Sequence, residues 1–230
     1  MRLGVRFLLA AALVPTAALT ADEPGRAEYA VRWDPTQGGP ANARELLAFL
    51  GASGGGGHVY EVRYFDLPRP ESAPAGATPI LRLRAAEGGD AEVRLKYRTE
   101  QPLEARWGCP AGASFEKSEE VDVTFAGSAT PVRMYAYACT LDAPAPPAFL
   151  GATPKSCAAR MVRYKNGDDK IEEWTLPGGA LRLEVSRTTS GSPKHEKKFR
   201  KLVDRLRARG VKPLDESKTE LGSRCPAANP

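Results

Sequence analysis

Apolar and polar residues alternate over short runs along most of the chain, a pattern typical of half-buried antiparallel strands. Clusters of proline and glycine separate these runs, and the alternation predicts roughly eight or nine strands. Their expected ranges are 29–33, 59–65, 80–84, 91–97, 121–125, 132–140, 159–164, 170–176 and 181–185. The fold class predicted from this pattern is α+β and mostly antiparallel β.

Two segments depart from the alternation and predict helices. The first follows Pro40, carries apolar residues at helical spacing and ends at Gly51. The second begins with Ser192 as its N-cap and Pro193 at its first position, and it stops at Gly210. The second helix also carries a basic face opposite its apolar stripe, which we interpret as a solvated surface rather than a partner site.

The first residues have the features of a secretory signal. Arg2 and Arg6 precede the apolar run 7–14, which is too short to span a bilayer, and small residues follow as far as Ala21. We therefore predict a cleaved signal at 1–21 and a single domain at 22–230, with no transmembrane anchor after cleavage. The expected location is the periplasm or the exterior of the cell.

All four cysteines lie in the predicted mature part, where an oxidising compartment favours disulfides. Four cysteines allow three connectivities, and the sequence leaves the choice open. Our preference is Cys109 with Cys139 and Cys157 with Cys225, because the second bond would tie down a proline-rich tail.

Charge and short motifs exclude several functions. The chain has 33 basic and 28 acidic residues, and two of the basic residues belong to the predicted signal. That excess is too small for a nucleic-acid-binding protein, so binding of an anion requires local placement of basic residues. The sequence contains no GxSxG, no GxGxxG and no P-loop, and only two histidines. A serine hydrolase, a dinucleotide cofactor and a histidine metal site are not expected.

Two neighbouring predicted strands carry basic residues at alternate positions. Arg82 and Arg84 share one face, and Arg94, Lys96 and Arg98 line one face of the next strand. Like charges that lie opposite each other destabilise a sheet, so water or an anion must neutralise them. The spacing alone allows either a solvated outer face or a concave face that binds an anion.

Several short motifs occur in a characteristic order: Glu28-Tyr-Ala-Val-Arg32, Tyr64-Phe-Asp66, Leu81-Arg-Leu-Arg84, Val93-Arg-Leu-Lys96, Glu120-Val-Asp122 and Leu183-Glu-Val-Ser186. In this order the chain resembles the CYTH superfamily, the triphosphate tunnel metalloenzymes. The resemblance implies a β-tunnel of eight or a similar number of antiparallel strands, with a few peripheral helices. It further implies that cations in the tunnel hold a triphosphate or polyphosphate and that carboxylates hold Mg²⁺ or Mn²⁺.

The resemblance also assigns roles to individual residues. The expected phosphate contacts are Arg82, Arg84, Arg94, Lys96, Arg160 and Lys218, and the expected metal ligands are Glu28 and Glu184, with Glu120 and Asp122 as weaker candidates. Three positions depart from the family pattern. Ala30 and Ser186 replace acidic residues, and Arg32 replaces a lysine. Loss of two carboxylates weakens a site for a hard divalent cation, so catalysis is expected to suffer more than ligand binding.

The sequence therefore predicts an exported CYTH-like domain that binds a phosphate-rich small molecule or polymer, with no nucleic acid as partner. Two alternatives stay open: a Mg²⁺- or Mn²⁺-dependent triphosphatase or inorganic polyphosphatase, and an envelope barrel that binds a partner but no phosphate. The natural ligand and the oligomeric state cannot be read from the sequence. Export itself favours a binding module, because nucleoside triphosphates are mainly cytosolic.

Overall fold

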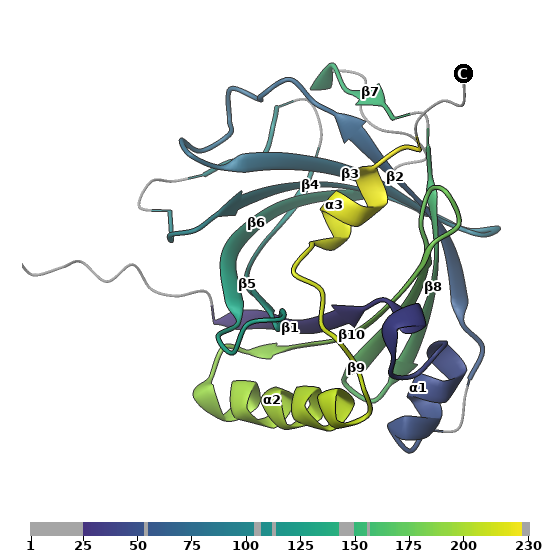
Figure 1. Cartoon of the computed structure of the whole chain (residues 1–230). Coiled ribbons are helices and arrows are strands. Elements are labelled where there is room, and N and C mark those ends of the chain that lie inside the picture. The colour runs from purple at the N-terminus through teal and green to yellow at the C-terminus, as the bar shows by residue number, and fades with distance from the viewer. Residues whose placement is uncertain are drawn as a thin grey trace, which may run out of the picture.

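Nine strands close into a barrel, and Figure 1 looks into its opening. The computed structural model describes residues 25–52, 55–103, 107–111, 114–142, 150–155 and 157–226. Within these ranges the barrel strands are β1 (Arg26–Trp33), β2 (His58–Asp66), β3 (Thr78–Ala86), β4 (Ala91–Thr99), β5 (Glu116–Thr124), β6 (Val132–Asp142), β8 (Ala159–Asn166), β9 (Asp169–Thr175) and β10 (Leu181–Ser190). They pair in the order β3-β4-β6-β5-β1-β10-β9-β8-β2, and β2 pairs with β3 to close the ring.

The strand prediction is confirmed in its main features. Each predicted run overlaps one barrel strand, and all but one of the pairings that close the barrel are antiparallel. The described barrel has nine strands rather than eight, and its β1–β5 pairing is parallel, with Glu28 opposite Asp122. The sequence pattern did not indicate β7 (Thr153–Pro154), which pairs with the last two residues of β2. It also did not indicate the short 3-10 helix η1 (Pro35–Gln37).

Apolar side chains cover the outside of this barrel, whereas many charged side chains face its interior. On β3 and β4 the buried residues Leu81, Val93 and Leu95 pack beneath outer segments that include Trp107 and Leu150. A strand sends alternate side chains to opposite faces, so the charged residues between these apolar positions are directed inward. The alternation seen in the sequence therefore places much of the hydrophobic core outside the ring of strands. A smaller apolar cluster shares the inward face with the charged side chains. It includes the buried residues Tyr64, Met161 and Trp174.

Two helices pack on the outer face of the barrel, the first against β9 and the second against β1 and β10. Helix α1 (Ala43–Phe49) starts at Asn42, whose side chain accepts a hydrogen bond from the backbone N–H of Glu45. Helix α2 (Pro193–Ala208) lies beneath β1 and β10 in Figure 1 and buries its apolar stripe there. That stripe consists of Phe199, Leu202, Val203 and Leu206, as expected from the sequence. Both predicted helices are thus present, with Ser192 as the N-cap residue of α2.

A third helix, α3 (Lys218–Ser223), lies across the barrel opening in Figure 1 and was not predicted. Ser217 and Glu220 form a reciprocal capping box at its start. Gly222 allows close packing on β2, because a Cβ atom at this position would stand 2.8 Å from Cε2 of Tyr64.

Disulfides fix two segments onto the barrel. Cys109 bonds to Cys139 of β6, and Cys157 bonds to Cys225, which follows α3. Both pairs are the ones we favoured from the sequence, and they indicate an oxidising compartment. The predicted signal at 1–21 lies outside the described residues. In the part of the chain that is described, no helix is sufficiently long and apolar to cross a membrane.

Candidate functional site

The barrel interior holds a cavity of about 330 Å³ whose wall is mostly charged. Among the described residues, nine basic and five acidic side chains line it. The basic ones are Arg26, Arg82, Arg84, Arg94, Lys96, Arg98, Arg163, Lys170 and Lys218, and the acidic ones are Glu28, Glu92, Glu116, Glu120 and Glu172. The lining carries an excess of positive charge, and this excess is concentrated in a small, partly enclosed volume.

The wall formed by β3 and β4 presents arginines that share one acidic partner. Glu92 accepts from Arg82 at 3.1 Å and from Arg84 at 3.0 Å, and the strand register places Arg82 opposite Arg94. Burial, together with the neighbouring charges of Arg82 and Arg163, lowers the pKa of Arg84 to about 10. The Nε atoms of Arg82 and Arg94 are buried without a hydrogen-bond partner in the described residues. This wall therefore has more donors than acceptors.

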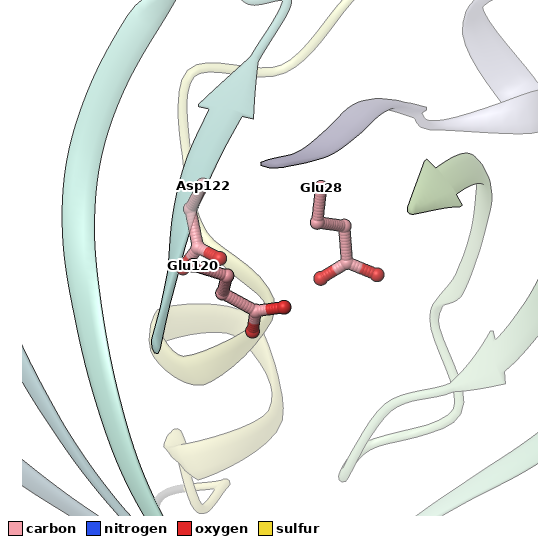
Figure 2. Close-up of side chains that lie close together, drawn as sticks. All are labelled: Glu28, Glu120 and Asp122. Carbon is pink, nitrogen blue, oxygen red and sulfur yellow. The ribbon is translucent and has the colours of Figure 1, made fainter. Parts of the chain in front are cut away.

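Three carboxylates meet at the adjoining part of the cavity. Glu28 comes from β1, and Glu120 and Asp122 come from β5; each contributes one oxygen to a group in which these atoms lie within 4.8 Å of one another. Figure 2 shows the Glu28 side chain extending into the space beside Glu120. The parallel register of β1 and β5 explains the meeting, because it sets Glu28 directly opposite Asp122.

Basic side chains contact every member of this acidic group. Lys96 Nζ lies 2.8 Å from Asp122 and 3.3 Å from Glu120, and Lys170 Nζ lies 3.2 Å from Glu28. Burial opposes the ionisation of Glu28, but the fields of Lys218, Lys170 and Lys96 outweigh it and hold its pKa well below the usual value. The pKa of Asp122 is lowered in the same way, since Lys96 and Arg98 outweigh the effect of burial. Glu28 and Asp122 are thus ionised, and all three carboxylates already have a basic partner.

On the opposite wall, two more deeply buried carboxylates hold α3 in place. Lys218, the first residue of α3, donates to Glu172 at 3.1 Å and to Glu184 at 2.7 Å. Glu172 also accepts from Arg163 at 2.6 Å, and Glu184 from Arg32 at 3.0 Å. Burial opposes the charge of Glu172, yet Lys218 and Arg163 keep its pKa far below the usual value. The same carboxylates raise the pKa of Lys218 against the effect of its own burial.

Five of the six predicted phosphate contacts line the cavity: Arg82, Arg84, Arg94, Lys96 and Lys218. Arg160 does not. It is exposed and borders a separate outer depression, whereas Arg163, three residues later, faces the cavity. An odd separation along a strand places two residues on opposite faces, and the choice between them could not be made from the sequence. Whether the inward cations bind phosphate stays a prediction.

Sequence reasoning assigned no role to several lining residues. Lys170 and Glu172 alternate with the buried Ile171 on β9, which is the same signal that identified β3 and β4. Arg98 was recognised as sharing the face of Lys96 but was not included in the site. No local signal indicated that these strands face one another across a closed barrel.

The donor set for a divalent cation does not match the set that the family resemblance implies. Of the four predicted ligands, Glu28, Glu120 and Asp122 come together, whereas Glu184 is outside their group and pairs with Arg32 and Lys218. At position 186 a hydroxyl stands in place of a carboxylate, and it donates to Glu28 at 3.3 Å. Each acidic member also has a basic partner. The residues present therefore do not fit a Mg²⁺ or Mn²⁺ site.

The fold and cavity define a class, a closed and mostly antiparallel β-barrel with a charged interior. No family model matches the chain, and neither does any curated protein. Solved structures with a similar fold include a conserved hypothetical protein from Pyrococcus furiosus. It is 14% identical with a TM-score of 0.50, and the match covers 85% of this chain and 99% of that one. This likeness supports the fold alone.

Two further structures are proteins of Pyrococcus horikoshii OT3. PH1819 is 16% identical with a TM-score of 0.47, and the match covers 84% of this chain and 97% of that one. PH1012 is 18% identical with a TM-score of 0.48, and the match covers 84% of this chain and 98% of that one.

Proposed function

We propose that this protein is an exported, CYTH-like β-tunnel that binds a phosphate-rich polyanion, a triphosphate or polyphosphate, inside the barrel. Its place of action is the periplasm or the exterior of the cell, where its two disulfides are stable. The principal contacts are arginines of β3, β4 and β8 together with the lysine that begins α3. They are Arg82, Arg84, Arg94, Arg163 and Lys218.

The observation that carries this proposal is the excess of cations around one cavity. Nine basic and five acidic side chains line about 330 Å³ among the described residues. Asp122 and Glu184 also pair with lining lysines, so seven carboxylates oppose nine cations and an anion would balance the remaining positive charge. Arginine offers a planar fork of donors that matches phosphate oxygens, and such charge-assisted bonds are stronger than neutral ones. The partly enclosed volume strengthens them further, because it screens charges less than bulk water does.

The partly exposed ion pairs of Glu92 suggest how a phosphate would reach Arg82 and Arg84. It holds Arg82 and Arg84 through one oxygen each, and its side chain is 22% exposed. A phosphate that approaches these arginines can use guanidinium N–H donors that Glu92 leaves free. Burial and charge repulsion between Arg82, Arg84 and Arg163 destabilise the ligand-free wall, and an anion relieves that repulsion.

A thermal-shift experiment with tripolyphosphate tests the proposal. Ligand at a hundredfold excess over Kd is expected to stabilise the mature protein by about 2.7 kcal/mol. The double change Arg82→Gln and Arg84→Gln should reduce this shift strongly. Arg160→Gln is the matched control, because Arg160 is an exposed arginine outside the cavity. Wild-type protein with no shift would leave the partner-binding barrel as the better explanation. An equal shift in all three proteins would place the ligand elsewhere.

A second candidate is a metal-dependent triphosphatase, favoured by the three carboxylate oxygens within 4.8 Å of one another. We rank it lower because Lys96, Arg98 and Lys170 already neutralise those carboxylates. The assay is phosphate release from tripolyphosphate with Mg²⁺ or Mn²⁺. Release above the no-protein control that disappears in Glu28→Gln would make this candidate the better one.

A further inference from the structure

The ammonium group of Lys96 contacts Glu120 and Asp122, which the family resemblance gives as the weaker two of four candidate metal ligands. Its Nζ is 3.0 Å and 2.8 Å from the two oxygens of Asp122 and 3.3 Å from Oε1 of Glu120. Three carboxylate oxygens thus surround one nitrogen. Its side chain is only 14% exposed, which makes this a largely buried arrangement.

We propose that Lys96 is a built-in replacement for the divalent cation, so that the cavity binds its polyanion without Mg²⁺ or Mn²⁺. This inference deepens the proposed function and rests on it for the polyanion. The part that concerns the metal stands on the contacts of Lys96 alone. In this arrangement Glu120 and Asp122 hold the side chain of Lys96 in place instead of coordinating a metal ion.

The neighbouring strand explains how Lys96 reaches these acids. Strand β6 lies between β4 and β5, and its register places Ala138 beside Lys96 and Ala136 beside Glu120. Paired residues of adjacent strands point to the same face, so only methyl groups stand between the lysine and Glu120, while Asp122 lies beside Met134. A larger side chain at either alanine would obstruct the contact. The two small residues on β6 therefore form part of the arrangement.

Charge argues against a metal ion at the same place. A divalent cation among these oxygens would lie close to Lys96, Arg98 and Lys170, which already contact the group at 2.8 to 3.2 Å. Mg²⁺ also needs near-octahedral oxygen coordination and loses its water reluctantly. Two positions that would supply further carboxylates carry Ala30 and Ser186 instead. The carboxylate oxygens are thus better matched to the ammonium group of Lys96 than to a divalent cation.

The first test uses Mn²⁺ alone, without tripolyphosphate, because polyphosphates themselves bind metal ions. Isothermal titration calorimetry should show at most weak binding of Mn²⁺ to wild-type protein. Lys96→Met leaves the carboxylates without their central cation and should bind Mn²⁺ at least tenfold more tightly than wild type, about 1.4 kcal/mol. Lys165→Met is the control, because Lys165 is an exposed lysine at the end of β8. Tight Mn²⁺ binding by wild-type protein would overturn the inference.

A second test uses only wild-type protein and therefore does not depend on the folding of a variant. Tripolyphosphate is titrated once in excess EDTA and once in excess Mg²⁺, and the inference expects affinity in EDTA to be at least as high. Binding that occurs only with Mg²⁺ would overturn the inference while leaving the proposed function intact. Absence of binding under both conditions would instead overturn the proposed function, and the Mn²⁺ titration would then decide the role of Lys96 by itself.

Discussion

The two walls of the cavity use the same kind of ion pair at very different degrees of burial. On β9 and β10, the side chains of Glu172 and Glu184 are only 2% and 1% exposed, and both hold Lys218. On β4, the side chain of Glu92 is 22% exposed and holds two arginines at similar distances. From this contrast we expect the pairs of β9 and β10 to support the barrel more than the pairs of Glu92 do, although Arg163 and Lys218 also face the cavity. A buried pair is costly to break, whereas a more exposed pair contributes little to stability.

The largest effect is expected from Glu172→Gln. This change leaves Arg163 without its acidic partner and removes one of the two carboxylates that hold Lys218. Breaking a buried pair typically costs about 3–5 kcal/mol, because an uncompensated charge stays buried. Urea denaturation would measure the loss in the free energy of unfolding. A loss below about 1 kcal/mol, the range of exposed pairs, would remove the distinction between the walls.

A somewhat smaller loss is expected when the bond between Cys157 and Cys225 is removed by serine at both positions. This disulfide spans 68 residues and ties α3 to the start of β8. Loss of a disulfide that closes a long loop costs about 2–4 kcal/mol. The pair Cys109 and Cys139 spans only 30 residues and serves as the comparison, with a smaller expected loss. Equal losses would mean that α3 is not held mainly by its covalent tether.

Acid should weaken both walls together. Glu28, Glu92, Asp122 and Glu172 all have a pKa below the usual value, because basic neighbours outweigh the effect of burial. A carboxyl whose pKa is lower in the folded state stabilises the fold fully above its unfolded pKa, about 3.9–4.3 for these residues. That contribution is lost as the pH falls further, so the thermal midpoint should decline below about pH 4. A midpoint that stays level down to about pH 2 would contradict these pairings.

The smallest change in stability is expected from Glu92→Gln, the counterpart of Glu172→Gln on the other wall. We expect a loss of about 1 kcal/mol or less, because the pair is partly solvated. Tripolyphosphate should bind more tightly to this variant, since Arg82 and Arg84 no longer share a competing carboxylate. Calorimetry measures the affinity. Weaker binding, or destabilisation as large as that of Glu172→Gln, would show that Glu92 supports the barrel instead.

The sequence predicts the strands well because each one carries its own alternation. Leu81, Leu83 and Leu95 against Arg82, Arg84 and Lys96 define two faces without any knowledge of the partner strands. It cannot show which of two faces turns inward on β8, where Arg160 and Arg163 lie on opposite sides. The parallel pairing that brings Glu28 to Asp122 joins residues far apart in the chain, and no local pattern encodes it.

Helix α3 illustrates a signal that was present but weak. Ser217-Lys-Thr-Glu220 matches a capping box, yet only six helical residues follow and they carry no clear apolar period. Its placement depends on Tyr64, on the carboxylates of β9 and β10 and on a disulfide, all of which are distant in sequence. The lysine that enters the cavity was therefore indicated only by the family resemblance.

The dependence of Glu172 and Glu184 on Lys218 also fixes an order of events during folding. Lys218 follows these residues by 46 and 34 positions, so a chain that emerges from its N-terminus first exposes β9 and β10 without the lysine that bridges the two carboxylates. Until then each carboxylate has only one charged partner, Arg163 for Glu172 and Arg32 for Glu184. The nine strands of the ring all precede that lysine, whereas α3, which lies across the opening, begins with it. The bridge between β9 and β10 and the covering of the opening thus belong to a part of the chain that is synthesised after the whole ring.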